Sequence, residues 1–397
     1  MRPTERRAGR VVASHQIARA AFLAALGFAV LAVGWGVYVL VAGGSWWGPL
    51  HAFLAGTVLL AIAGAGQMFT ITWSSTIPPR AVTVVMQRWL LVVGVGLVLA
   101  GVTFDAPALV WVGGTSTIAG LVILGWVILS AVRKSLLRRF DLSARFYLLA
   151  FAAGIVGVAL GTLMGVGAMG GFFTTGRLVH AHLNLIGLVG LTIIGTIPTL
   201  LPTTAYHRAV SGKEALWAWW LSLAGTAAIV SGLWEPRLAG VGTLAIALAG
   251  LLALGGILVR IGDRGRHKIT FLQITIGTLW LIGWAIADGL TLAGGRAMTQ
   301  FSGWTGAVVL AGVGQVLAGS LAYLVPVLRG SPFEENREAM ERRPWLPLVA
   351  LNAAGLCLGV GLPVPAIVLT GVWLGDFAFR LARVLGRRRD EEAGPGD

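Results

Sequence analysis

The chain contains a single cysteine, Cys357, among its 397 residues. One cysteine excludes a disulfide within the chain and any zinc site built from several thiolates. Its neighbours in LNAAGLCLGVGL are apolar, so we expect Cys357 to pack rather than react. Charge is also scarce: 12% of the residues are charged and 56% are hydrophobic, whereas a soluble domain carries about 25% charged residues. Most of the chain is therefore not expected to face water.

Acidic residues are scarcer than basic ones, 16 against 30, and the net charge is +14. Such a balance is compatible with nucleic-acid binding, but the positions of the charges relative to the apolar segments argue against it. Apolar runs of about 18–26 residues, the length that spans a bilayer, occur twelve times. They are approximately 21–43, 51–73, 82–103, 107–132, 146–170, 179–202, 215–233, 238–259, 269–290, 302–328, 345–362 and 364–385.

The basic residues lie on one side of this pattern. All but three of the 30 Lys and Arg fall in alternate connections, or in the ends of the spans beside them, beginning with the N-terminal segment; the exceptions are Arg177, Arg237 and Arg296. The positive-inside rule therefore predicts that both termini are cytoplasmic, in a multi-pass protein of the plasma membrane. The basic charge is explained by topology, so the expected partner is the lipid bilayer and not nucleic acid.

The predicted fold class is an all-α polytopic membrane protein with about 12 transmembrane helices. A basic cytoplasmic segment, 1–20, precedes the membrane domain, 21–385, and a charged cytoplasmic tail, 386–397, follows it. The first apolar run is too long for the h-region of a signal peptide, so we expect it to remain as the first span.

Two of the apolar segments begin alike. HAFLAGTVLLAIAGAGQ starts at His51, and HAHLNLIGLVGLTIIGT starts 129 residues later at His180. A fainter third copy, TGAVVLAGVGQVLAGSLAYLVPVLR, matches the first at Gly314-Gln315. The repeat predicts three four-helix units, whereas a major-facilitator carrier divides its twelve spans six plus six. The predicted units are about 21–132, 146–259 and 269–385.

Three of the six histidines, His51, His180 and His182, lie at the predicted outer boundary of the membrane. Neutral imidazole is a common ligand of copper, iron and zinc, and it also binds haem iron axially. His180 and Asn184 share a helix face, whereas His180 and His182 point about 200° apart, so one ion is not expected to bind both. The alternative interpretation is a set of interfacial histidines bonded to loop carbonyls.

Other polar residues have candidate roles. Asp288 is either a carboxylate that orients a metal-binding histidine or a solvated acid at a helix end. Arg177 is a candidate partner for haem propionates. Gln67 and Gln315 are expected to cross-link helices inside the membrane. Asp376 is expected to form a structural ion pair with Arg380, one turn later and near the predicted cytoplasmic side. The remaining three histidines also belong to the predicted cytoplasmic side; they are His15, His207 and His267.

The motifs HAFLAG and HAHLNLIG, within twelve spans arranged as three four-helix units, resemble the haem-copper oxidase subunit I superfamily, and within it the non-canonical NnrS-like branch. The resemblance covers residues 20–385. It implies that His51 binds a low-spin haem and that His180 or His182 binds copper. Asn184 stands where the family has a tyrosine, and the family's histidines of spans seven and ten are absent here. The resemblance therefore implies no complete oxygen-reducing centre, and the chain is not expected to be a terminal oxidase.

Three functions follow from these patterns. The first is a membrane protein that binds haem, copper or both near the outer surface, in nitric oxide or copper handling or in electron transfer with an external electron donor or copper protein. The second is a small-molecule transporter or channel with the histidines and Asn184 at its outer mouth. The third is a scaffold-like relative that has lost its metal. The sequence leaves open whether the protein is an enzyme.

Overall fold

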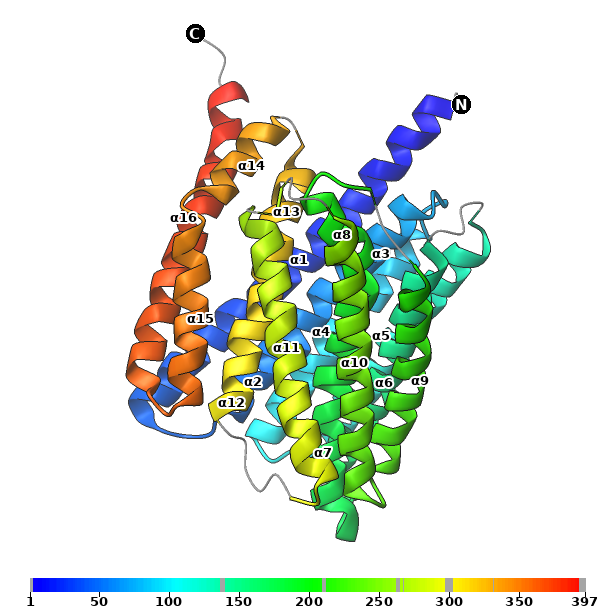
Figure 1. Ribbon diagram of the computed structural model, residues 1–397, viewed down its shortest axis with the longest axis vertical. Helices are drawn as coiled ribbons and strands as arrows, with labels where there is room; N and C mark the ends of the chain where they lie inside the picture. Colours follow the sequence, from blue (N-terminus) through cyan, green and yellow to red (C-terminus); the bar gives the residue numbers. More distant parts are fainter. Residues whose placement is uncertain are drawn as a thin grey trace. The chain divides into compact units, whose positions relative to one another are not determined.

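The computed structural model describes residues 3–135, 140–208, 212–261, 265–266, 268–296, 303–330 and 332–392, and every regular element in these ranges is a helix (Figure 1). The chain divides into two compact units. Unit 1 comprises Met1–Gly195 and Trp219–Ile246, and unit 2 comprises Thr196–Ala218 and Ala247–Asp397.

Each of the twelve predicted spans coincides with a helical segment. These segments are α1 (Pro3–Ala42); α2 (Trp47–His51) with η1 (Ala52–Val58) and α3 (Leu59–Trp73); α4 (Ala81–Thr103); α5 (Pro107–Arg133); α6 (Asp141–Gly165); η3 (Gly170–Phe172) with α7 (Phe173–His182), η4 (Leu183–Gly190) and α8 (Leu191–Thr204); α9 (Lys213–Ser231); α10 (Pro236–Arg260); α11 (Ile269–Ala293); α12 (Gly303–Ala307) with η5 (Val308–Gly314) and α13 (Gln315–Arg329); α15 (Trp345–Gly359); and α16 (Pro363–Glu392).

Ten helices in the described part of the chain are long and apolar enough to cross a membrane. The remaining two predicted spans, α9 and α15, are helical but do not belong to these ten; α15 has only 15 residues. The architecture is therefore that of an all-helical, multi-pass membrane protein, and the crossing of α9 and α15 stays a prediction. One helix was not predicted, the nine-residue α14 (Phe333–Glu341), which carries four glutamates.

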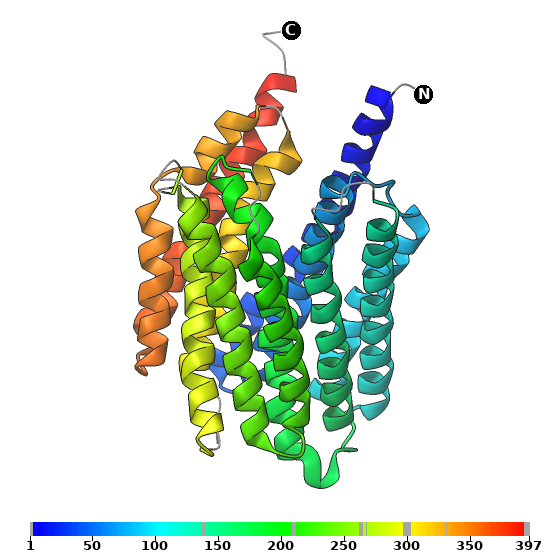
Figure 2. The same cartoon turned by 45° about the vertical axis from the view of Figure 1, so that its right-hand side comes forward.

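In unit 1, consecutive helices pack in pairs. α1 packs against η1 and α3, α4 against α5, and α6 against α7 and η4, while α5 also contacts α6. Figure 2 shows α4, α5 and α6 as neighbouring rods in cyan and teal. Glycine permits the closest approach: a Cβ atom on Gly94 would lie 2.9 Å from the carbonyl oxygen of Gly113. Small residues at such positions are the usual means by which helices associate in lipid.

Unit 2 repeats this pairing. α11 packs against η5 and α13, and α15 packs against α16. The short helix α14 contacts α13 and α16. The same pairing, first helix on second and third on fourth, therefore occurs in the first and last predicted repeats.

In the described residues, three π-helical segments, η1, η4 and η5, occur at corresponding places inside the second, sixth and tenth predicted spans. π-helical turns are rare and are often found at functional sites. Each segment begins directly after a different residue: His51, His182 and Ala307. The backbone thus matches His51 with His182, two residues beyond the His180 that the sequence match selects. In the third repeat, the π-helical segments match His51 with Ala307, about two helical turns beyond the position that the sequence match gives.

Two buried amides cross-link neighbouring helices, as the sequence predicted. Gln67 of α3 donates a hydrogen bond to Gln87 of α4 at 3.0 Å. Gln315 of α13 accepts a hydrogen bond from Asn352 of α15, also at 3.0 Å, and Asn352 accepts one from Trp280 of α11 at 2.7 Å. In both cases the amide of a second helix binds the third helix of the same predicted repeat.

The predicted ion pair in the last span is present. The Arg380 Nε atom lies 2.6 Å from Asp376 Oδ2, and both side chains are about nine-tenths buried or more. Arg380 also donates hydrogen bonds to the carbonyl oxygens of Met340 and Arg343, at 2.6 and 3.0 Å. Arg343 has a positive φ of 50°, which is unfavourable for a residue with a side chain. The guanidinium therefore connects α16 to the strained turn between α14 and α15.

Candidate functional site

His51 lies at the end of α2, directly before the π-helical turn, and is half-buried. Its Nδ1 atom lies 2.8 Å from the carbonyl oxygen of Trp47, one turn earlier. The indole ring of Trp47 stacks on the imidazole, with ring centroids 4.3 Å apart. One hydrogen bond and one aromatic face therefore fix the orientation of this ring.

His180 lies in α7 and is also half-buried. Its Nδ1 atom lies 2.7 Å from the carbonyl oxygen of Gly157 in α6. The Asn184 amide nitrogen lies 3.3 Å from the same ring atom and 2.8 Å from the backbone oxygen of His180. Because the imidazole Nδ1 must donate its proton to the Gly157 carbonyl, the amide of Asn184 donates to the backbone oxygen instead.

Two glycines of α6 make room for these side chains. A Cβ atom on Gly161 would lie 2.6 Å from His180 Cε1, and one on Gly157 would lie 2.5 Å from Asn184 Nδ2. Gly157 and Gly161 are four residues apart, so they lie on one face of α6, matching the spacing of His180 and Asn184 on the facing helix. The close approach also brings the Gly157 carbonyl within hydrogen-bond distance of the imidazole.

The rings of His51 and His180 face each other across two spans that are far apart in sequence. Their centroids are 6.2 Å apart and their planes differ by only 19°. The structure therefore brings together two of the predicted ligand residues.

The hydrogen bonds also determine which ring nitrogen is available. A carbonyl oxygen only accepts, so the Nδ1 atoms of His51 and His180 must both carry the proton. In a neutral imidazole the Nε2 atom then has the free lone pair. An Nδ1–H bond to a backbone carbonyl is the usual way in which proteins orient a metal-binding histidine.

His182 follows His180 by two residues in the same helix. It is buried at 2% exposure, and its Nδ1 atom lies 2.8 Å from the carbonyl oxygen of Leu178 in its own helix. Within the described ranges, no three His, Cys, Asp or Glu side chains lie together as a metal cluster. A metal-binding role for His182 stays a prediction.

The other predicted site residues lie at several places. Arg177 is exposed on α7, one turn before His180. Asp288 is buried in α11 of unit 2, so its role as the partner of a metal-binding histidine stays a prediction. His15 lies in α1 and His207 follows α8, while His267 lies outside the described residues.

Sequence reasoning missed three residues of this site: Trp47, Gly157 and Gly161. A tryptophan beside the predicted membrane boundary is typical of the interfacial aromatic belt, and nothing in the sequence distinguishes a stacking role. The two glycines form a GxxxG pattern, GVALG, which is a recognised signal for close helix contact. That pattern identifies a contact face but not the histidine that occupies it.

Gly161→Ala should disturb the site more than an alanine elsewhere in unit 1. The new Cβ atom must push the His180 ring aside, and overpacking of this kind typically costs about 1–3 kcal/mol. We expect a lower unfolding midpoint. Gly96→Ala is the matched control, because a Cβ atom on Gly96 of α4 meets no atom within 4 Å. Equal behaviour of the two variants would contradict a tight fit between Gly161 and His180.

No family model matches this chain, and no curated protein matches it. The class of protein is defined by its described helices alone: it is an all-helical, multi-pass membrane protein.

Proposed function

We propose that this protein is an integral membrane metalloprotein that binds copper, haem or both through His51 and His180. The observation that supports this most directly is the 6.2 Å separation of the two nearly parallel imidazole rings, each with its Nδ1 proton directed to a backbone carbonyl. Two Nε2 lone pairs are thereby presented from two separate helices.

The donor set fits copper best. Imidazole suits copper, iron and zinc, but a protein zinc site normally supplies at least three ligands. Two neutral imidazoles are sufficient to hold a copper ion, and a single one suffices as the axial ligand of haem iron. Bound copper would supply one-electron redox chemistry at this end of unit 1. The chain's own groups would hold the ligands in place: Trp47 and Gly157 orient the two rings, and Asn184 closes the turn beside His180.

We further propose twelve spans with both termini in the cytoplasm of a plasma-membrane protein, based on the one-sided distribution of Lys and Arg. In this orientation the histidine pair lies near the outer surface. An external electron donor or copper protein is then the natural partner, because cysteine is too scarce for a Cys-based redox site in the chain itself. Nitric oxide or copper handling is the role in keeping with the sequence resemblance, and oxygen reduction is not.

The first experiment is an optical spectrum of the detergent-purified protein, oxidised and dithionite-reduced, with metal analysis of the same sample. We expect about one copper per chain. A Soret band would instead identify haem, with Arg177 then a candidate for its propionates. A colourless, metal-free protein that does not bind added copper or haem would refute the proposal. That result would favour a transport path lined by His180 and Asn184.

A further inference from the structure

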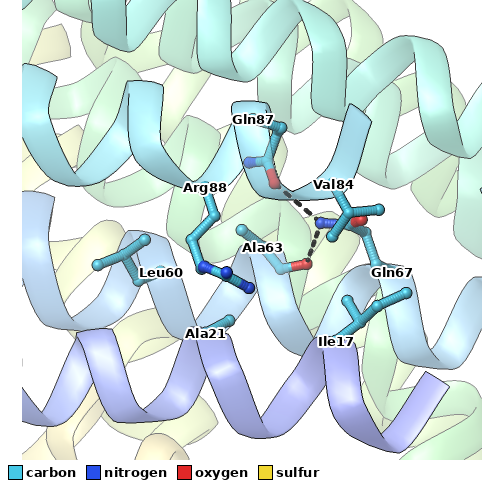
Figure 3. Close-up of a pocket in the computed structure, with 8 residues that line it drawn as sticks. All are labelled: Ile17, Ala21, Leu60, Ala63, Gln67, Val84, Gln87 and Arg88. Atoms are coloured by element: carbon cyan, nitrogen blue, oxygen red, sulfur yellow. Dashed lines mark hydrogen bonds between the residues drawn. The ribbon is translucent and has the colours of Figure 1, made fainter. Parts of the chain in front are cut away.

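A second polar cluster lies in unit 1, between α1, α3 and α4, away from the histidine pair. It lines a cavity of about 10 Å³, space for a single particle about the size of a water molecule. Most of the lining is aliphatic, and its polar side chains are Gln67, Gln87 and Arg88 (Figure 3). Polar groups that face such a small space need a partner there.

The hydrogen bonds of the two amides leave specific atoms unused. Both protons of Gln67 Nε2 are donated, to the carbonyl oxygen of Ala63 at 3.2 Å and to Gln87 Oε1 at 3.0 Å. This assignment fixes the orientation of both amides, since a carbonyl oxygen only accepts. The Gln87 Nε2 atom therefore has no hydrogen-bond acceptor, although the side chain is only 1% exposed. Gln67 Oε1 is also unpaired.

Arg88, which is half-buried, adds a positive charge to this cluster. It lies two turns inside α4, and its side chain extends toward Ala21 of α1 and Ala63 of α3 (Figure 3). No residue in the described part of the chain forms a hydrogen bond or ion pair with its guanidinium group. A charged side chain inside a span is costly unless it is paired, and such residues usually mark a functional site.

We propose that this cavity binds one small monovalent anion, of the size of chloride. Arg88 would supply the opposite charge and N–H donors, and Gln87 Nε2 would supply a further donor. A water molecule would satisfy the amides but would leave the charge of Arg88 uncompensated. The small volume suits a monatomic ion better than a phosphate group. In Figure 3 the Gln67 oxygen lies on the side away from Arg88, where it does not repel an anion.

The test uses the full-length protein in detergent. Thermal unfolding is measured in sodium chloride and in sodium gluconate at equal ionic strength and pH, and bound ³⁶Cl⁻ is measured by equilibrium dialysis. We expect chloride to raise the unfolding midpoint by a few degrees in a saturable way, because a ligand that binds only the folded state stabilises it. Dialysis should find about one chloride per chain.

The variants separate an anion site from a general salt effect. Arg88→Gln should abolish the chloride dependence, and Gln87→Glu should also abolish it while keeping the fold, because the new carboxylate takes the place of the anion beside Arg88. Arg88→Lys should retain a weaker dependence. Arg80→Gln removes an exposed arginine just before α4 and should leave the dependence unchanged. Equal midpoints in the two salts for the wild type, or a chloride effect that survives in Gln87→Glu, would overturn the proposal. Neither result depends on copper or haem binding.

Discussion

His180→Ala should weaken metal binding by more than about 100-fold. Loss of a group that merely orients a ligand typically costs 10–100-fold in metal affinity, so loss of one of two ligands should cost more. The measurement is a copper titration of the purified protein in competition with a chelator of known affinity. His51→Ala should have an effect of the same size, because each variant leaves a single imidazole at the site. The double variant should then show little additional loss.

His182→Ala is the informative control for this prediction. His182 is buried only two residues away, and its ring is bonded to its own helix. The His182→Ala variant should leave the metal affinity within a few-fold of the wild type. Some loss of stability is expected because His182 is buried. His207→Ala, in unit 2, controls for the removal of a histidine as such. The two-histidine site is wrong if His182→Ala removes the metal while His180→Ala retains it.

Asp376→Asn should lower the free energy of unfolding by about 3–5 kcal/mol, the usual cost of removing one partner from a buried ion pair. Arg380 would keep its charge in a site where its side chain is only 5% exposed. Its hydrogen bonds to Met340 and Arg343 would then hold an uncompensated cation between α16 and the turn before α15. Unfolding in increasing dodecyl sulfate, followed by circular dichroism, measures the change.

Two comparisons make this result specific. Glu334→Gln breaks the 2.7 Å ion pair with Arg337, whose glutamate side chain is 64% exposed, and it should cost less than about 1 kcal/mol. The double variant Asp376→Leu with Arg380→Met removes both charges and should be more stable than Asp376→Asn alone. Should Asp376→Asn cost no more than Glu334→Gln, the ion pair does not stabilise this part of unit 2.

The helices and the polar cross-links were largely predictable from the sequence. The apolar runs coincide with helices because a segment about 20 residues long and nearly free of charge has few other stable conformations in a bilayer. Gln67, Gln315 and the pair of Asp376 with Arg380 were predicted for a related reason: a polar group in lipid must find a partner. The sequence identified these residues but not their partners Gln87 and Asn352, which lie on other helices.

The repeat was only partly predictable. The second and sixth spans begin with similar sequences, which identified these spans as equivalent. That similarity matched His51 with His180. The π-helical turns match His51 with His182 instead, and both of these rings bind the carbonyl one turn earlier. A π turn alters the local helix geometry through its backbone hydrogen bonds, so residue spacing alone does not predict its position.

The sequence by itself determined that this is a helical membrane protein, how its basic residues are distributed, and that three of its six histidines gather at one end of two related spans. These properties depend on composition and on local periodicity. Only the tertiary structure decided that His180 and not His182 lies beside His51, because that choice depends on the approach of α6. Gly157 and Gly161 allow the approach, and a carbonyl 23 residues from His180 then fixes the direction of its ring. Contacts between residues so far apart in the chain depend on how the helices pack, which no single segment specifies.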